Sequence, residues 1–267
     1  MVEALPRAIR LKLQQALAQW QRWREGPGEI PVAVALLADG ISNTSIQVKS
    51  RADSWVVRID GANPMQLGLN RNAEWRCLEL ANQHGLAPAP AYRNPELGVL
   101  VTRYLPRDAT AVDRPGELEA TAQLLRSVHQ LPAIKFRLDP VERAHRYAQQ
   151  CAGQPSVEFL NTCEQLRESA AEPVLCHNDL LRSNRLFSGG RLIALDWEYA
   201  AMGDPLFDLA VVIEGDELAE AAAATLLEHW LQRSPFKSEQ QRLNQQRIVY
   251  RELGRLWGEA YARITNK

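Results

Sequence analysis

The chain lacks the features that mark membrane, nucleic-acid-binding and disulfide-stabilised proteins. Its 267 residues carry 31 Lys and Arg against 32 Asp and Glu, and a formal net charge of −1 offers no basic surface to nucleic acid or to an anionic membrane. No apolar run is long enough to cross a bilayer, and the first ten residues contain charges but no signal-peptide core. We therefore expect a cytoplasmic protein with no membrane insertion, whose partner is a small molecule or another protein. The sequence carries no signal for an oligomeric state.

Cysteine is also scarce, with 4 residues and no C-x-x-C pair. This pattern predicts neither a zinc site nor a disulfide framework, and it is typical of small buried side chains in a reducing compartment. The remaining composition, 46% hydrophobic and 24% charged, is that of an ordinary globular protein and excludes disorder, collagen and coiled coil. At this length we expect one large domain or two lobes packed together.

The hydrophobic periodicity predicts two lobes of different character. The first, residues 1–105, has a leader helix, several strands and one long helix; the second, residues 106–267, is mainly helical. The predicted helices are 4–24, a segment from the cap at Asn70 to Gly85, 115–131, 140–151 and 156–169, with more helix at the C-terminal end. The predicted strands are 32–37, 44–49, 55–59, a hairpin within 88–104, and an island at 173–196. The expected fold class is α+β.

The strand-rich island carries the residues most suited to chemistry. A buried strand leads into His177 and Asp179, and Asn184 lies five residues beyond Asp179. A hairpin that turns at residues 188–190 then ends at Asp196, which brings this carboxylate back beside Asn184. An amide oxygen next to a carboxylate suits Mg²⁺, and Asp179 would stand nearby as a base or orienting group. Each residue alone could be a loop cap, but the ordered set is typical of phosphoryl transfer.

These residues resemble the choline/ethanolamine kinase and aminoglycoside phosphotransferase superfamily, in particular its bacterial choline-kinase-like and thiamine-kinase-like branch. The resemblance lies in His177-Asn178-Asp179 to Asn184, in Asp196-Trp197-Glu198-Tyr199, and in the GDPLFDLA segment at 203–210, and it extends over residues 37–213. It implies a bilobal, protein-kinase-like fold with a small antiparallel-sheet lobe and a larger helical lobe. ATP would bind in the cleft between the lobes.

The resemblance also implies roles for individual residues. Asp179 would be the catalytic base, His177 would shape the loop, and Asn184 and Asp196 would hold Mg²⁺. Asp208 would brace the catalytic loop through hydrogen bonds to its backbone. Asp204 is the weaker candidate for this bracing role, because an Asp followed by Pro is equally typical of a helix N-cap.

The nucleotide side departs from the usual kinase pattern. The chain has only five lysines, and Lys49 alone lies in the right region. Arg58 is in better register with the phosphate-binding cation of the family, and a guanidinium can bind phosphate oxygens bidentately. Its expected carboxylate partner is Glu74, with Glu79 as the weaker option, although Glu74 could also belong to a solvated helix face.

A G-x-G-x-x-G loop is missing as well. Residues 40–44 stand in its place, and Ser42, Asn43 and Thr44 could cap the phosphates with hydroxyl groups and backbone N–H groups. Taken alone, this segment is an ordinary polar turn. Residues 101–105 are expected to form the hinge whose backbone reads adenine.

The phosphate acceptor is expected to be a small cationic alcohol, of choline or thiamine type. Such a cation binds aromatic faces and acidic groups, for which Tyr199, Glu198 and Trp257 are the candidates. Tyr250, Trp257 and Tyr261 share one helix face, which core packing would explain equally well. An aminoglycoside or amino-sugar kinase would instead show an acidic pocket. A third possibility is a catalytically silent nucleotide-binding protein. The presence of Asp179, Asn184 and Asp196 together argues against it.

Overall fold

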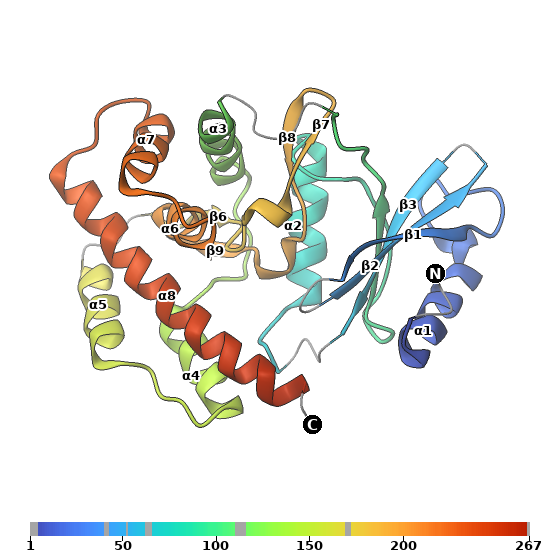
Figure 1. The fold of residues 1–267 in the computed structure, drawn as a ribbon, viewed down its shortest axis with the longest axis horizontal. Helices are drawn as coiled ribbons and strands as arrows, with labels where there is room; N and C mark the ends of the chain where they lie inside the picture. The colour runs from blue at the N-terminus through green and yellow to red at the C-terminus, as the bar shows by residue number, and fades with distance from the viewer. Residues whose placement is uncertain are drawn as a thin grey trace. The chain divides into compact units, whose positions relative to one another are not determined.

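A computed structural model describes residues 5–39, 43–51, 53–61, 66–109, 116–168 and 172–265 (Figure 1). The chain divides into two compact units. One, the sheet unit, comprises Met1–Pro64 and Pro88–Pro106; the other, the helical unit, comprises Met65–Ala87 and Arg107–Lys267. No helix within the described ranges has the length and apolar character needed to span a membrane.

The sheet unit is built around a five-stranded antiparallel sheet in the order β1-β2-β3-β5-β4. Its strands are β1 Val32–Asp39, β2 Asn43–Ser50, β3 Asp53–Asp60, β4 Pro90–Asn94 and β5 Val99–Arg103. Apolar residues from β2, β3 and β5 alternate inward and form one core with helix α1, Arg7–Ala18, and with Trp23, which follows the short helix η2, Trp20–Arg22. The strands expected within residues 32–104 are all present in this sheet.

The helical unit begins with α2, Arg71–Gln83, whose ends lie where the sequence predicts them. The Asn70 side chain accepts hydrogen bonds from the backbone N–H groups of Asn72 and Ala73, both at 3.1 Å, and so caps the helix. Gly85 follows the helix with a φ of +70°, in the left-handed region that favours glycine. The confirmed cap and stop therefore set the length of α2.

The other helices are α3 Glu117–His129, α4 Pro140–Gln150, α5 Val157–Glu168, α6 Pro205–Gly215, α7 Glu220–Leu231 and α8 Lys237–Thr265. The long helix α8 packs along α4, α5 and α6, and α3 packs on α7 (Figure 1). Helix α6 is apolar around most of its circumference and is almost wholly buried at the centre of this unit. The expected α+β fold class is confirmed.

Two small antiparallel ribbons lie within the helical unit. Strand β6, Val174–Cys176, pairs with β9, Ala201–Gly203, and the hairpin joins β7, Arg185–Ser188, to β8, Arg191–Ala194. The short helix η3, Arg182–Asn184, precedes β7, and the short helix η4, Trp197–Tyr199, follows β8. The hairpin and its turn were expected, whereas β9 was not, because its residues, Ala-Met-Gly, include neither a β-branched nor an aromatic side chain.

Candidate functional site

The loop that follows β6 is anchored by a buried histidine. His177 is fully buried, and its Nε2–H donates to the carbonyl oxygen of Leu195 at 2.9 Å, because a carbonyl can only accept. Its ring lies 4.8 Å from the ring of Trp197, centroid to centroid. Burial lowers the pKa of His177 to about 4, against the weaker opposing effect of Asp208. The ring is therefore neutral near pH 7 and acts as a structural link between the loop and the end of β8.

Asp208 holds the backbone of the same loop. It lies on α6, is fully buried, and accepts hydrogen bonds from the backbone N–H groups of His177 at 2.8 Å and Asn178 at 2.6 Å. Asn178 has a φ of +63°, a left-handed conformation that costs energy unless its surroundings fix it. The two bonds to Asp208 supply that restraint. This is the geometry that a loop-bracing residue requires.

A histidine and a tryptophan extend the support of Asp208. The Nε2 atom of His129 on α3 lies 3.0 Å from Asp208, and the indole N–H of Trp230 on α7 donates to Nδ1 of His129 at 3.1 Å. An indole N–H is only a donor, so Nδ1 must be unprotonated and Nε2 must carry the proton that binds Asp208. The resulting chain joins α7, α3 and α6 to the loop. Sequence reasoning missed His129, whose partners all come from distant segments.

The catalytic and metal candidates meet at the other end of the loop. The Asn184 amide donates through Nδ2 to the backbone oxygen of Asp179 at 2.8 Å and to its Oδ2 at 2.9 Å. The backbone N–H of Leu195 donates to the backbone oxygen of Asn184 at 2.8 Å, so Asp196 follows immediately beside it. Asp196 itself has a φ of +57°. The hairpin thus joins Asn184 to the start of the Asp196 segment, as the turn at 188–190 led us to expect.

The charges at this end of the loop fit a divalent cation. Burial, followed by the nearby charges of Asp196 and Glu198, raises the pKa of Asp179 well above its usual range, and the hydrogen bond from Asn184 opposes the shift. Since Nδ2 of Asn184 is committed to Asp179, its Oδ1 is the atom left to act as a ligand. An amide oxygen among crowded carboxylates is a donor set that Mg²⁺ prefers, and the cation would relieve the repulsion.

Glu198 is buried beside this cluster and is paired with an arginine that the sequence did not single out. Nη1 of Arg71 lies 2.9 Å from Oε2 of Glu198 and 2.7 Å from Oε2 of Glu74. Arg71 therefore joins the first turn of α2 to η4. The spacing of Arg71 and Glu74 at i and i+3 was visible in the sequence, but the contact with Glu198 spans 127 positions and was not.

Two of the predicted aromatic residues lie beside Tyr199. Trp257 donates its indole N–H to the Tyr199 hydroxyl at 2.9 Å and stacks on Tyr261 with ring centroids 5.2 Å apart. Trp230 binds His129, and the Tyr250 ring packs against Phe207. Burial, followed by the nearby charge of Asp179, raises the pKa of Tyr250, so this side chain also lies within the influence of the catalytic loop. Two late-helix aromatic side chains therefore accompany Tyr199.

Two buried residues of α4 complete the surroundings of Tyr199. The Arg143 guanidinium lies 5.5 Å from the centre of the Tyr199 ring, and its Nη1 lies 3.5 Å from the Tyr147 hydroxyl. Burial raises the pKa of both tyrosines, and the charges of Asp179 and Glu198 add to the shift at each hydroxyl. These two carboxylates and both tyrosines thus share one neighbourhood. Arg143 and Tyr147 look like ordinary helix residues in the sequence, so no signal separated them from the core.

The nucleotide candidates are distributed over both units. Arg58 is buried on β3, where it pairs with Ser45 and Leu100 in register and lies 3.7 Å from Asp60. Glu74 belongs to the helical unit, so its pairing with Arg58 stays a prediction. Asn43 and Thr44 open β2, and Ser42 lies outside the described residues.

Asp204 takes the alternative role considered for it. It is the N-cap of α6, where its Oδ1 accepts from the backbone N–H of Leu206 at 3.0 Å and Pro205 occupies the first helical position. Its Oδ2 accepts from Arg242 and Gln246, both at 2.6 Å. Asp204 therefore caps α6 and ties it to α8, and Asp208 is the residue that contacts the loop.

An antiparallel sheet unit, a helical unit and a loop with His177, Asp179 and Asn184 ahead of Asp196 define the class of kinase-like phosphotransferases. The profile of the phosphotransferase enzyme family matches residues 33–243. The chain belongs to this family and is a phosphotransferase.

Individual relatives agree with this assignment. The chain is 27% identical over 241 residues to Protein LicA of Haemophilus influenzae, covering 82% of this chain and 70% of the relative. In fold it is similar to the choline kinase LicA from Streptococcus pneumoniae, with a TM-score of 0.72 and 23% identity over 86% of each chain. It is also similar to a choline/ethanolamine kinase family protein from Mesorhizobium loti, with a TM-score of 0.71 and 22% identity over 92% of this chain and 85% of the other. An aminoglycoside-3'-phosphotransferase of type VIII is similar too, with a TM-score of 0.61 and 18% identity over 94% of this chain and 100% of the other.

Proposed function

We propose that the protein is an ATP-dependent kinase that transfers the γ-phosphate of ATP to the hydroxyl of a small cationic alcohol of choline type. The observation that carries this proposal is the loop geometry. Asn184 donates to both the backbone oxygen and the carboxylate of Asp179, while its own backbone oxygen is bound at the end of β8 next to Asp196. The candidate base, Asp179, and the candidate metal ligands, Asn184 and Asp196, are thereby held together within one segment of the chain.

Within this proposal, each residue of the loop has a distinct task. Asp179, whose pKa is raised above its usual range by burial and neighbouring carboxylates, accepts the proton of the acceptor hydroxyl and orients it. Asn184 and Asp196 would hold Mg²⁺, which when bound neutralises charge on the transferred phosphate. Asp208 and His177 keep the loop backbone in place, since they bind its N–H groups and the end of β8. Arg58, assisted by Glu74, is the candidate for the nucleotide phosphates.

A cationic acceptor is supported by the charges and rings near Asp179. Glu198 and Asp179 are both close enough to influence the Tyr199 hydroxyl, and the stacked pair of Trp257 and Tyr261 offers aromatic surface. The similarity to choline and choline/ethanolamine kinases supports the same class. Arg143 already lies against the Tyr199 ring, so we assign the cation to the aromatic face of Trp257, with Glu198 as the acidic group.

The test is a transfer assay with radiolabelled ATP and Mg²⁺ against choline, ethanolamine, thiamine, amino sugars and aminoglycosides. We expect the label to appear on a choline-type alcohol. Transfer to an aminoglycoside or amino sugar instead would select the alternative acceptor class. Nucleotide binding without any transfer would indicate a catalytically silent protein.

Two variants control the site assignment. Asp179→Asn removes the base and Asp196→Asn removes a metal ligand, and each should lower turnover of the best acceptor at least about 100-fold. Unchanged turnover in both variants would show that the chemistry occurs elsewhere in the protein.

A further inference from the structure

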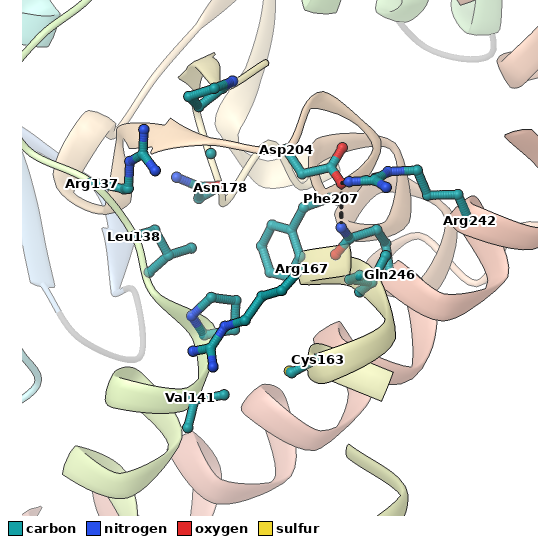
Figure 2. A pocket seen from close by; sticks show the side chains of 14 residues that line it. Arg137, Leu138, Val141, Cys163, Arg167, Asn178, Asp204, Phe207, Arg242 and Gln246 are labelled. Atoms are coloured by element: carbon teal, nitrogen blue, oxygen red, sulfur yellow. Dashed lines mark hydrogen bonds and ion pairs between the residues drawn. The ribbon is translucent and has the colours of Figure 1, made fainter. Parts of the chain in front are cut away.

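A cavity of about 180 Å³ lies behind the catalytic loop, and the reaction described above makes no use of it. We refer to it as the Asn178 cavity. Its lining comes from the N-terminal ends of α4 and α6, the C-terminal end of α5, strand β9 and helix α8 (Figure 2). Its volume is smaller than the ~300–1,000 Å³ of sites for drug-sized ligands, yet about ten times the ~10–15 Å³ that one water needs. The space therefore suits a small ion or molecule.

Asn178, one of the residues that line this cavity, carries an unpartnered acceptor atom. The Nδ2 atom of Asn178 donates to the backbone oxygen of Tyr199 at 3.0 Å, which identifies the other amide atom as Oδ1. Oδ1 is buried and has no hydrogen-bond partner among the described residues, and Asn178 as a whole is only 9% exposed. A buried amide oxygen without a partner is destabilising, because it has given up its hydrogen bonds to water. A ligand that donates one hydrogen bond to Oδ1 would remove this cost.

The lining also carries positive charge. Arg137, Arg167 and Arg242 contribute to it, and in Figure 2 Arg137 and Asn178 lie to one side of the space and Arg242 to the other. Arg242 is paired with Asp204, and Arg167 with Asp139. Arg137 is exposed and makes no side-chain hydrogen bond or ion pair with the part of the chain that the structure describes. These pairings leave one net positive charge at the cavity.

Asp204, the carboxylate in the lining, is not available to bind a cation. Both oxygens of Asp204 already accept hydrogen bonds, Oδ1 from the backbone of Leu206 and Oδ2 from Arg242 and Gln246. The ligand must therefore satisfy two demands: a negative charge for Arg137 and one hydrogen-bond donor for Asn178. Hydrogen phosphate combines both, because it keeps one hydroxyl group throughout the neutral pH range. Sulfate lacks the donor, and a phosphate monoester loses its own above a pKa of about 6.

We propose that the Asn178 cavity is a binding site for inorganic hydrogen phosphate, whose hydroxyl donates to Oδ1 of Asn178 and whose anionic oxygens face Arg137. Asn178 directly precedes Asp179, so the bound ion would contact the catalytic loop through the Asn178 side chain, whereas Asp208 holds the loop through its backbone. The residues that line this cavity do not include the acceptor and nucleotide residues assigned above.

Titration calorimetry of the full chain tests the proposal. Phosphate and sulfate are compared at pH 7.5 and equal ionic strength, with a non-hydrolysable ATP analogue and Mg²⁺ in excess, so that nucleotide phosphate contacts are already filled. We expect phosphate to bind with one site and at least about tenfold more tightly than sulfate, because only hydrogen phosphate satisfies Oδ1. Absence of phosphate binding, or equal affinity for sulfate, overturns the proposal.

Two variants and one matched control locate the binding. A Cβ at position 203 would lie 3.9 Å from Oδ1 of Asn178 and 3.8 Å from Sγ of Cys176, ordinary contacts that the fold accommodates. Gly203→Ala should therefore abolish the preference for phosphate over sulfate while the protein stays folded. Arg137→Ala, at an exposed position, should weaken both anions about fivefold. Arg7→Ala removes an exposed arginine of the sheet unit and should change nothing. Phosphate affinity that survives both cavity variants places the ion elsewhere and refutes the assignment.

Discussion

The support of the catalytic loop by Asp208 leads to a quantitative prediction for Asp208→Asn. The carboxylate is fully buried and accepts three hydrogen bonds, at 2.8 Å from the N–H of His177, at 2.6 Å from that of Asn178, and at 3.0 Å from His129. Asparagine has nearly the same shape but replaces one oxygen with an NH₂ group. Because all three partners are donors, whichever way the amide turns, at least one donor faces another donor.

The cost follows from these contacts. If the NH₂ group faces Asn178, one buried N–H loses its acceptor, which costs about 1–3 kcal/mol. The other two bonds lose the charge that strengthened them, about 1 kcal/mol each. We expect Asp208→Asn to lower the free energy of unfolding by about 3–5 kcal/mol, out of a typical total of about 5–15 kcal/mol. Since a shift of about 1 Å at a catalytic group can cost 100-fold in rate, kcat should fall by about that factor.

Urea denaturation and steady-state kinetics measure the two effects. Asp204→Asn is the matched control, because this aspartate lies on the same helix end, and asparagine is an equally good N-cap. It should cost some stability through Arg242 and leave kcat unchanged. If Asp208→Asn loses no more stability than Asp204→Asn and keeps its kcat, the bracing role is wrong.

Three further predictions concern charge, pH and capping. Arg143→Gln removes a buried positive charge that lies 5.5 Å from the Tyr199 ring, so KM for a cationic alcohol should fall several-fold with little change in kcat. A rise in KM would instead indicate an acceptor with an anionic group. The pKa of His177 is about 4 in the folded state and about 6.5 in the unfolded state, so the unfolded state binds more protons at pH 5. The free energy of unfolding of the wild type should therefore fall by about 2 kcal/mol between pH 7 and pH 5 through this residue. Denaturation curves of His177→Gln should lack this share of the pH dependence, and an equally steep loss would contradict the assignment. Asn70→Ala should lower the thermal stability of α2 by about 1 kcal/mol, whereas Asn70→Ser should be close to neutral in the same melting experiment.

Local chemistry explains the parts of the fold that could be predicted. The cap at Asn70, the glycine turn at 188–190 and the apolar spacing of α8 are all decided by residues a few positions apart. Strand β9 could not be predicted, since its three residues are extended only because β6 lies beside them. The loop residues of the site, by contrast, could be predicted, because their spacing along the chain is local.

The supporting residues of the site could not be found in this way. Arg71 contacts Glu198 across 127 positions, and His129 contacts Asp208 across 79. Nothing in the residues flanking Arg71 or His129 distinguishes them from other arginines and histidines on helices. Their roles arise only when α2 meets η4 and α3 meets α6, so they belong to the tertiary structure rather than to any motif.

Trp230 further determines how His129 supports the loop. A histidine nitrogen that accepts a hydrogen bond from an indole N–H carries no proton itself. His129 is therefore oriented so that its Nε2–H donates to Asp208, whose carboxylate also accepts from the backbone N–H groups of His177 and Asn178. Trp230→Phe removes the bond that fixes this ring and keeps an aromatic side chain in its place. We expect the variant to stay folded and to lose several-fold in kcat with little change in KM for ATP, because the loop is less firmly positioned; an unchanged kcat would show that the loop does not depend on this chain of bonds.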